Sequence, residues 1–431
     1  MTLGKSTLLV MASRIFVMFA GLIVSVVAAH SLSSVEQGYF FTFLSIAAAQ
    51  TLFELGITNL ILHHLSHARA AVMSAKDKLQ KRTALDLAES TRAYSSRYFR
   101  RAAVLFTVFV GLGGALFFAW SHSAQGVHWQ LPWALMVAAT ALSLFNLTYY
   151  SHLEAFGRLS VSYRVRMAST TILIAAFCLA AFSWGGLMSY PLALLASNGY
   201  AFAVLRRACA DVNREHCLDG TYTPQHVDIG REQRKMAVSA VAGYVTANTL
   251  TPYAFHFFGA EMAGQVGLTM SIFAAIAAVA MARTTAEAPT YGPLIASGEL
   301  TTLKRRFRGT LLFSIALAVA LGVGAILARQ VGLAFAPRYD NRVLDVVGFA
   351  VIGLLIVANV TLSVTSTVLR AFKTEQLMWP SLAAAALVLA GQLTLRLNPV
   401  HCLALLAAFN GLVFYPFARH RLFAQIAARH A

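Results

Sequence analysis

Apolar segments recur along the whole sequence, and each is long enough to cross a lipid bilayer. A helix needs about 20 predominantly apolar residues to span a hydrocarbon core of roughly 30 Å. Such segments occupy residues 7–29, 37–62, 102–121, 131–152, 167–184, 186–205, 237–258, 263–281, 310–327, 347–369, 377–395 and 400–418. Because backbone polar groups must be satisfied inside lipid, the sequence predicts an all-α polytopic membrane protein of about 12 transmembrane helices.

The basic residues gather on one side of the predicted membrane. The formal net charge is +17, which on its own would suggest a nucleic-acid partner. With both termini placed in the cytosol, however, only Arg329, Arg338, Arg342 and Arg396 of the 34 Lys and Arg residues fall outside. This asymmetry follows the positive-inside rule. We therefore expect a multi-pass protein with cytosolic termini and no nucleic-acid partner.

A polar gap divides the segments into two groups of six. The sequence predicts an N-terminal six-helix bundle over residues 1–205, a cytosolic linker over 206–236 and a C-terminal six-helix bundle over 237–431. An even number of helices in each half means that both halves enter the membrane in the same direction. Two bundles related by a pseudo-twofold axis along the membrane normal are therefore expected.

Two pairs of similar sequences support an internal duplication. "YYSHLEAFGRLS", which starts at Tyr149, and "TSTVLRAFKTEQ", which starts at Thr365, share Leu, Ala and Phe at the same spacing. Each contains the end of the fourth apolar segment of its half. "GYFFTFLSIAAA" from Gly38 and "GQVGLTMSIFAA" from Gly264 form a second pair, in the second segment of each half.

The order and spacing of these motifs resemble the polysaccharide flippase branch of the multidrug/oligosaccharidyl-lipid/polysaccharide exporter superfamily. "LFELGITNLIL", "LEAFGR", "LRAFKT", "AEAPTYGPLIASGE" and "GLAFAPRYDNRVLDVV" carry the resemblance, which covers nearly the whole chain. His30 stands where the family commonly has Arg, and Glu54 where it usually has Asp. The resemblance implies alternating-access flipping of an undecaprenyl-pyrophosphate-linked oligosaccharide, such as an O-antigen, capsule or exopolysaccharide repeat unit, across the bacterial inner membrane.

Four ionisable residues fall within or beside the predicted spans. Arg14 lies about 10 Å above the cytosolic start of the first span, at 1.5 Å per residue, and Glu54 lies at a similar depth in the second. Arg283 and Glu287 fall inside the eighth if that helix continues toward Pro289. Charge in a bilayer is costly and by default suggests function. We expect these residues to line a cavity that binds pyrophosphate; the alternative is a structural ion pair between Arg14 and Glu54.

Two further sets of residues are candidates for entry and gating. Arg158 and Arg370 stand just past the fourth and tenth segments and are predicted either to attract an anionic lipid carrier to a cytosolic entrance or to anchor helix ends at phospholipid head groups. Asn248, Thr251 and Pro252 lie within one turn of the seventh segment. Since proline frees a backbone carbonyl and permits a bend, a gating hinge is expected there, with a simple kink as the alternative.

The polar stretch from His63 to Arg101 holds nine Lys or Arg residues and three acidic residues. It is predicted to include an amphipathic helix on the anionic inner leaflet, with binding of a cytosolic partner as the alternative.

Several function classes remain to be distinguished. A cation-coupled multidrug exporter and a peptidoglycan-precursor flippase of the same superfamily are alternatives, as is a membrane-embedded glycosyltransferase or acyltransferase, for which Asp340 is the one candidate acid. We expect no enzymatic activity, no catalytic residues, no metal site and no cofactor. Without a nucleotide-binding motif, energy would come from an H⁺ or Na⁺ gradient, the membrane potential or substrate supply. Expected partners are the lipid-linked substrate, membrane lipids and a polysaccharide polymerase or glycosyltransferase.

Overall fold

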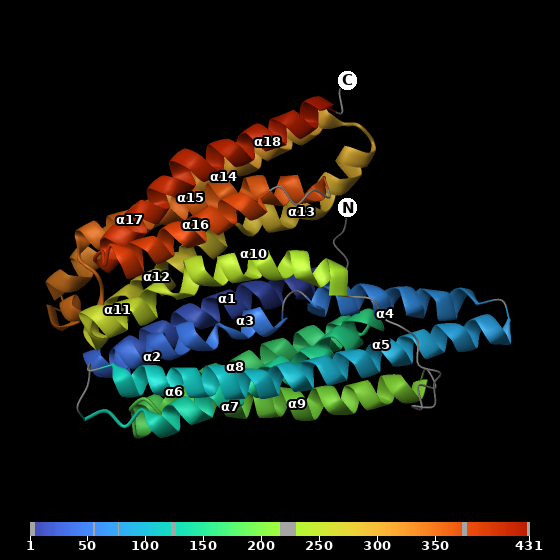
Figure 1. Cartoon of the computed structure of the whole chain (residues 1–431), viewed down its shortest axis with the longest axis horizontal. Coiled ribbons are helices and arrows are strands. Elements are labelled where there is room, and N and C mark those ends of the chain that lie inside the picture. Colours follow the sequence, from blue (N-terminus) through green and yellow to red (C-terminus); the bar gives the residue numbers. More distant parts are fainter. Residues whose placement is uncertain are drawn as a thin grey trace. The chain divides into compact units, whose positions relative to one another are not determined.

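The computed structural model describes residues 5–54, 57–75, 77–121, 126–215, 230–335, 337–372 and 377–428. Every regular element in these ranges is helical (Figure 1). The chain divides into two compact units, Met1–Tyr244 and Val245–Ala431. Part of the predicted linker, residues 206–215, continues the preceding helix, and residues 216–229 lie outside the described ranges.

The helices of the first unit are α1 (Lys5–Ser31), α2 (Ser34–Ala47), α3 (Gln50–Glu54), α4 (Ile57–Ser74), α5 (Lys78–Leu105), the π-helical turn η1 (Phe106–Val110), α6 (Gly111–Trp120), α7 (Gln130–Ala155), α8 (Leu159–Ser183), α9 (Ser189–Glu215) and most of α10 (Gly230–Asn248). Within this unit α9 packs against both α7 and α8, and α8 packs against α1.

The helices of the second unit are α11 (Leu250–Phe258), α12 (Ala260–Ala280), α13 (Ala282–Ala296), α14 (Leu300–Phe335), the 3₁₀ helix η2 (Pro337–Arg342), α15 (Val346–Ala371), α16 (Met378–Leu389), η3 (Ala390–Thr394), α17 (Pro399–Phe409), η4 (Asn410–Phe414) and α18 (Tyr415–Ala428). Both η3 and η4 are π-helical turns that continue the helices before them. Helix α15 packs against α12, α14, α17 and α18.

The described helices confirm the all-α membrane fold. Seven of them are long and apolar enough to cross a bilayer by length and composition. The other predicted spans also fall on helices, but some are interrupted. The second predicted span is divided among α2, α3 and α4, and the seventh between α10 and α11. Interruptions inside apolar segments are not visible in a hydropathy pattern, because the residues on both sides stay apolar.

The basic stretch after residue 62, for which a surface helix was predicted, forms helices that lead into a membrane span. It forms the distal part of α4 and most of α5, and α5 continues through η1 and α6 as one helix over Lys78–Trp120. Because α5 continues into a span, we expect it to leave the leaflet rather than to lie flat on it. Its inner face instead packs against α4 and α7, and buried residues of α4, α5, α7, α8 and α9 form one apolar cluster around Leu65, Phe99 and Leu153.

Candidate functional site

The break in the second span places Glu54 at the end of a short helix. Helix α2 begins at a capping box, in which Ser33 and Glu36 satisfy each other's backbone N–H groups, and it ends at Ala47. After one turn, α3 runs only to Glu54. Tyrosine hydroxyls satisfy two backbone carbonyls beside the interruptions: Tyr244 donates to Ser45 O at 3.3 Å, and Tyr98 donates to Phe53 O at 2.9 Å.

Glu54 itself is half-buried and forms no ion pair or hydrogen bond with the residues that the structure describes. The backbone of Arg14 lies in α1, but its side chain is outside the described part of the structure. The predicted pairing of these two residues therefore stays a prediction. Leu55 and Gly56, which follow Glu54, also lie outside the described ranges.

Arg283 and Glu287 are brought together on α13. They lie one helical turn apart, and Arg283 Nε donates to Glu287 Oε1 at 2.9 Å. The other carboxylate oxygen, Oε2, accepts hydrogen bonds from the hydroxyls of Thr310 and Tyr291. The carboxylate is thus held by three neighbours from two helices, α13 and α14. Its side chain is 21% exposed, whereas that of Arg283 is 42% exposed.

The guanidinium of Arg283 retains donors that no described residue uses. Only Nε forms a hydrogen bond within the described part of the chain. The guanidinium lies 5.4 Å from the centre of the Phe313 ring, and Gly309 leaves room for Nη2, which is 3.6 Å from where a Cβ on that glycine would stand. Terminal guanidinium nitrogens that are not used by other residues can bind two oxygens of a phosphate group in parallel. Arg14 and Glu54 belong to the first unit and Arg283 and Glu287 to the second, so a cavity shared by all four stays a prediction.

The two predicted entrance residues differ from each other. Arg158 precedes α8 and forms an ion pair with Glu215 at the end of α9, with Nη2 2.6 Å from Oε2. Arg370 lies in the last turn of α15, is exposed, and forms no ion pair with a described residue. The charge of Arg158 is therefore offset by a carboxylate, whereas that of Arg370 is not. Glu215 is far from Arg158 in sequence, so no local pattern indicates this contact.

The helix at the predicted hinge is interrupted just before Pro252, where the missing N–H of the proline leaves a backbone carbonyl without its helical hydrogen bond. Helix α10 ends at Asn248 and α11 begins at Leu250, with a bend at Thr249. Pro252 has no N–H with which to bond the carbonyl of Asn248, four residues earlier. Thr251 is buried in the first turn of α11. The interruption agrees in position with the prediction; whether it moves is a separate proposal.

Sequence reasoning missed a buried polar network midway along α5. Glu89 is almost fully buried and pairs with Arg92 on the next turn of α5. With its amide oriented to satisfy its neighbours, Asn213 of α9 accepts from Arg92 and donates to His152 of α7. Polar residues on a helix with no membrane-spanning signal suggest a solvated face. Glu89 and Arg92 share a helical face with Ala88 and Ser95, which are also buried. This spacing is the signal that could have indicated that the face packs against other helices.

Comparisons with solved structures identify the fold. The chain is similar to an inward-facing multidrug resistance MATE family transporter of the MOP superfamily, with a TM-score of 0.67, 14% identity, and coverage of 100% of this chain and 97% of that one. The lipid II flippase MurJ in an inward closed conformation gives a TM-score of 0.58 at 13% identity, covering 98% of this chain and 90% of that one. A point mutant of the Vibrio cholerae MATE transporter VcmN gives 0.56 at 14% identity, covering 98% and 96%.

At identities this low the likeness concerns the fold, a two-lobed helical membrane bundle, and not the cargo. These neighbours are transporters and a flippase rather than enzymes. No family model matches the sequence, and no curated protein matches it.

Proposed function

We propose that the chain is a flippase that moves an undecaprenyl-pyrophosphate-linked oligosaccharide across the bacterial inner membrane by alternating access. The observation that carries this proposal is Arg283, a half-exposed arginine with terminal nitrogens that no described residue occupies. A pyrophosphate group offers paired anionic oxygens that match such a guanidinium. The fold shared with transporters and a lipid flippase supports movement of cargo rather than chemistry on it.

In this proposal Glu287 has a positioning role. Its carboxylate is fixed by Thr310 and Tyr291, and it holds Arg283 through Nε alone. The ion pair would also lower the cost of keeping a guanidinium within the bilayer. Arg14 would add a second cation, and Glu54 would pair with an arginine or take up a coupling H⁺ or Na⁺.

A multidrug exporter is the second candidate, because MATE transporters are among the structural neighbours with TM-scores above 0.5. Such a protein would use Glu54 and Glu287 to bind cationic drugs, and the arginines would be structural. The lipid II flippase MurJ has a comparable likeness to the chain, and a peptidoglycan precursor also carries a pyrophosphate. The first distinction to make is therefore between an anionic and a cationic cargo.

Binding of two probes to purified protein makes this distinction. We expect geranylgeranyl pyrophosphate to bind and ethidium not to bind. Arg283→Ala should weaken pyrophosphate binding at least tenfold, the scale of one lost charge-assisted hydrogen bond of about 1.5–3 kcal/mol. Arg305→Ala is the matched control, because it removes an exposed arginine from the first turns of α14, outside the predicted cavity. Ethidium binding that is lost in Glu287→Gln would favour the exporter instead.

A further inference from the structure

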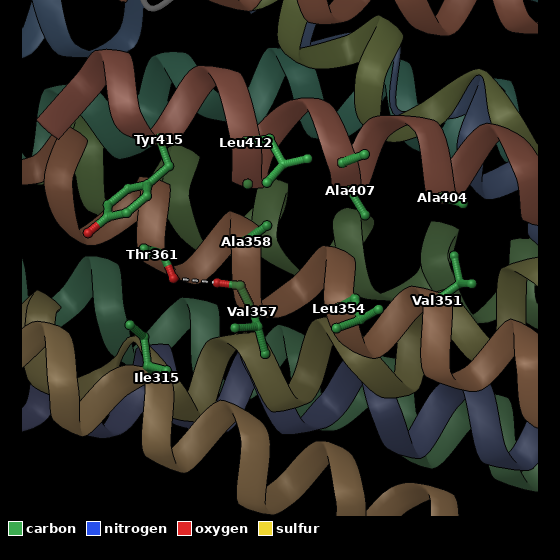
Figure 2. Close-up of a pocket in the computed structure, with 12 residues that line it drawn as sticks. Ile315, Val351, Leu354, Val357, Ala358, Thr361, Ala404, Ala407, Leu412 and Tyr415 are labelled. Atoms are coloured by element: carbon green, nitrogen blue, oxygen red, sulfur yellow. Dashed lines mark hydrogen bonds between the residues drawn. The ribbon is translucent and has the colours of Figure 1, made fainter. Parts of the chain in front are cut away.

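A groove runs along the second unit between α15 and the continuous helix formed by α17, η4 and α18 (Figure 2). Its volume is about 520 Å³, and Ile315 of α14 contributes to its wall. The residues on α15 extend from Val351 to Thr361, about 15 Å at 1.5 Å per residue. Both walls belong to helices long and apolar enough to cross the membrane. The groove therefore lies along the hydrocarbon region.

Small residues create the groove on one wall. On α17 and η4 the lining residues at successive turns are Ala404, Ala407, Ala408 and Gly411. A Cβ on Gly411 would stand 4.0 Å from Ala358 Cβ across the groove, which is ordinary van der Waals contact. The π-helical turn that begins at Asn410 is fixed to α15, because Asn410 Nδ2 donates to Asn359 Oδ1 at 2.8 Å.

The groove walls are almost entirely apolar. Thr361 lines the groove, but its hydroxyl donates to Val357 O within its own helix at 2.6 Å. The other polar lining residue is Tyr415, at the end of the groove nearer the C-terminus (Figure 2). Two large residues, Leu354 and Leu412, line the groove and are 66% and 78% exposed. Side chains that project this far hinder the 8–10 Å approach that a second helix would need, but they leave space for a single hydrocarbon chain.

Arginines continue the same helix faces beyond one end of the groove. Arg419 follows Tyr415 by four residues on α18, and Arg308 precedes Ile315 by seven on α14, so each falls on the face of its helix that lines the groove. Both are exposed. On the predicted topology this is the cytosolic end. Basic pockets between transmembrane helices on the cytosolic side are typical binding sites for anionic lipid head groups.

We propose that this groove binds an anionic phospholipid of the cytosolic leaflet. One acyl chain occupies the apolar groove, and the phosphate lies at Arg419 and Arg308 beyond Tyr415. The apolar length followed by two cations matches an amphiphile with a negative head group. The site belongs to the second unit alone, and it does not depend on the cargo proposed above.

Native mass spectrometry of the purified protein, titrated with phosphatidylglycerol or phosphatidylcholine of the same acyl composition, tests the site. We expect a single phosphatidylglycerol adduct that phosphatidylcholine does not reproduce. Arg419→Ala should lower its affinity about fivefold, which corresponds to roughly 1 kcal/mol per basic residue near the head group. Gly411→Leu, which fills the groove, should abolish the adduct. Gly324→Leu is the matched control, because a side chain at that exposed position on α14 meets nothing within 4 Å.

Two results would overturn the proposal. Equal binding of both lipids, unchanged in Arg419→Ala, would mean that the groove binds acyl chains without recognising the head group. A dimer that Gly411→Leu converts to a monomer would mean that a second copy occupies the groove. Neither result would bear on the pyrophosphate binding assigned to Arg283, which is measured with a different probe.

Discussion

Gly157 joins α7 to α8 in a conformation that other residues adopt at a cost. Its φ is +79°, and the guanidinium of Arg69 lies 2.5 Å from where a Cβ would stand. Gly157→Ala should therefore lower the free energy of unfolding by at least about 1–2 kcal/mol, the cost of a left-handed backbone for an L-residue. Thermal unfolding of the detergent-solubilised protein measures this.

Gly199→Ala provides the control for that substitution. It lies inside α9, where a Cβ meets nothing within 4 Å, so alanine should leave stability unchanged or raise it by up to about 1 kcal/mol. If both variants unfolded at the same temperature, the turn at Gly157 would not have the described geometry.

Cys209 should resist alkylation in the folded protein. It lies on α9 beyond the predicted span, and burial raises the pKa of its thiol to about 12. Because only the thiolate reacts, maleimide at pH 8 should leave it unmodified until the protein unfolds. Peptide mass mapping before and after denaturation measures the maleimide labelling of Cys209 separately from that of the other cysteines. Rapid labelling of the native protein at pH 8 would show that the α7–α9 contact opens.

The sequence was enough to choose the charged residues of the candidate site, but it did not predict most of the residues that they contact. Arg283 and Glu287 were predicted to line a cavity, and their ion pair with each other was not predicted, although residues four apart on a helix share a face. The contribution of Thr310 to the same carboxylate depends on how α14 packs, which no local pattern encodes. The same holds for the ion pair between Arg158 and Glu215, which joins the start of α8 to the end of α9.

At the scale of elements, the interruption between α10 and α11 can be tested through Pro252. Pro252→Ala restores the N–H that bonds the Asn248 carbonyl and should favour a continuous helix. If the bend serves gating, transport should fall while thermal stability stays the same or rises. Pro191→Ala is the control, because Pro191 lies in the first turn of α9, where a missing N–H breaks no helical bond. Unchanged transport in Pro252→Ala would leave the bend a structural kink.

The hairpin of α4 and α5 should extend into water. From Ala102 back to Lys78, α5 is about 36 Å long at 1.5 Å per residue. A fluorophore on a cysteine at Ser74, in a variant without the four native cysteines, should be quenched by aqueous iodide and not by brominated lipid. A fluorophore at Leu112, which is exposed on α6, should show the opposite pattern. Quenching of the Ser74 probe by brominated lipid would instead support the surface helix that the sequence suggested.

The positions and order of the apolar spans followed from hydropathy, because a span must be apolar along its whole length. The interruptions within the spans could not be predicted from hydropathy. Only the one near Pro252 was expected, because of the proline. Nothing in the apolar residues around Ala48 distinguishes the broken second span from the eighth, which α12 forms without a break up to Ala280 before a turn at Met281 separates it from α13. The turn there depends on tertiary contacts, among them the bond from Tyr244 to Ser45. Such contacts appear only once the helices have packed.

Across the whole molecule, the two units repeat local structure as well as sequence. Helix α7 ends at Ala155 and α15 at Ala371, and each is followed by a phenylalanine C-cap. The dihedral angles are φ −82°, ψ 10° at Phe156 and φ −78°, ψ 1° at Phe372. Gly38 and Gly264 are both buried, each near the start of its helix. Corresponding helix ends with nearly the same geometry support an internal duplication.

We proposed that the molecule carries a pyrophosphate-linked sugar from the cytosolic leaflet. The most direct measurement is mass spectrometry of polyprenyl-linked saccharides in cells depleted of the protein and complemented with the wild type, Arg283→Ala or Arg305→Ala. We predict that a complete repeat unit accumulates on its lipid carrier in depleted cells and with Arg283→Ala, and that the wild type and Arg305→Ala clear it. Normal levels of the lipid-linked saccharide, together with sensitivity to cationic drugs, would contradict the claim.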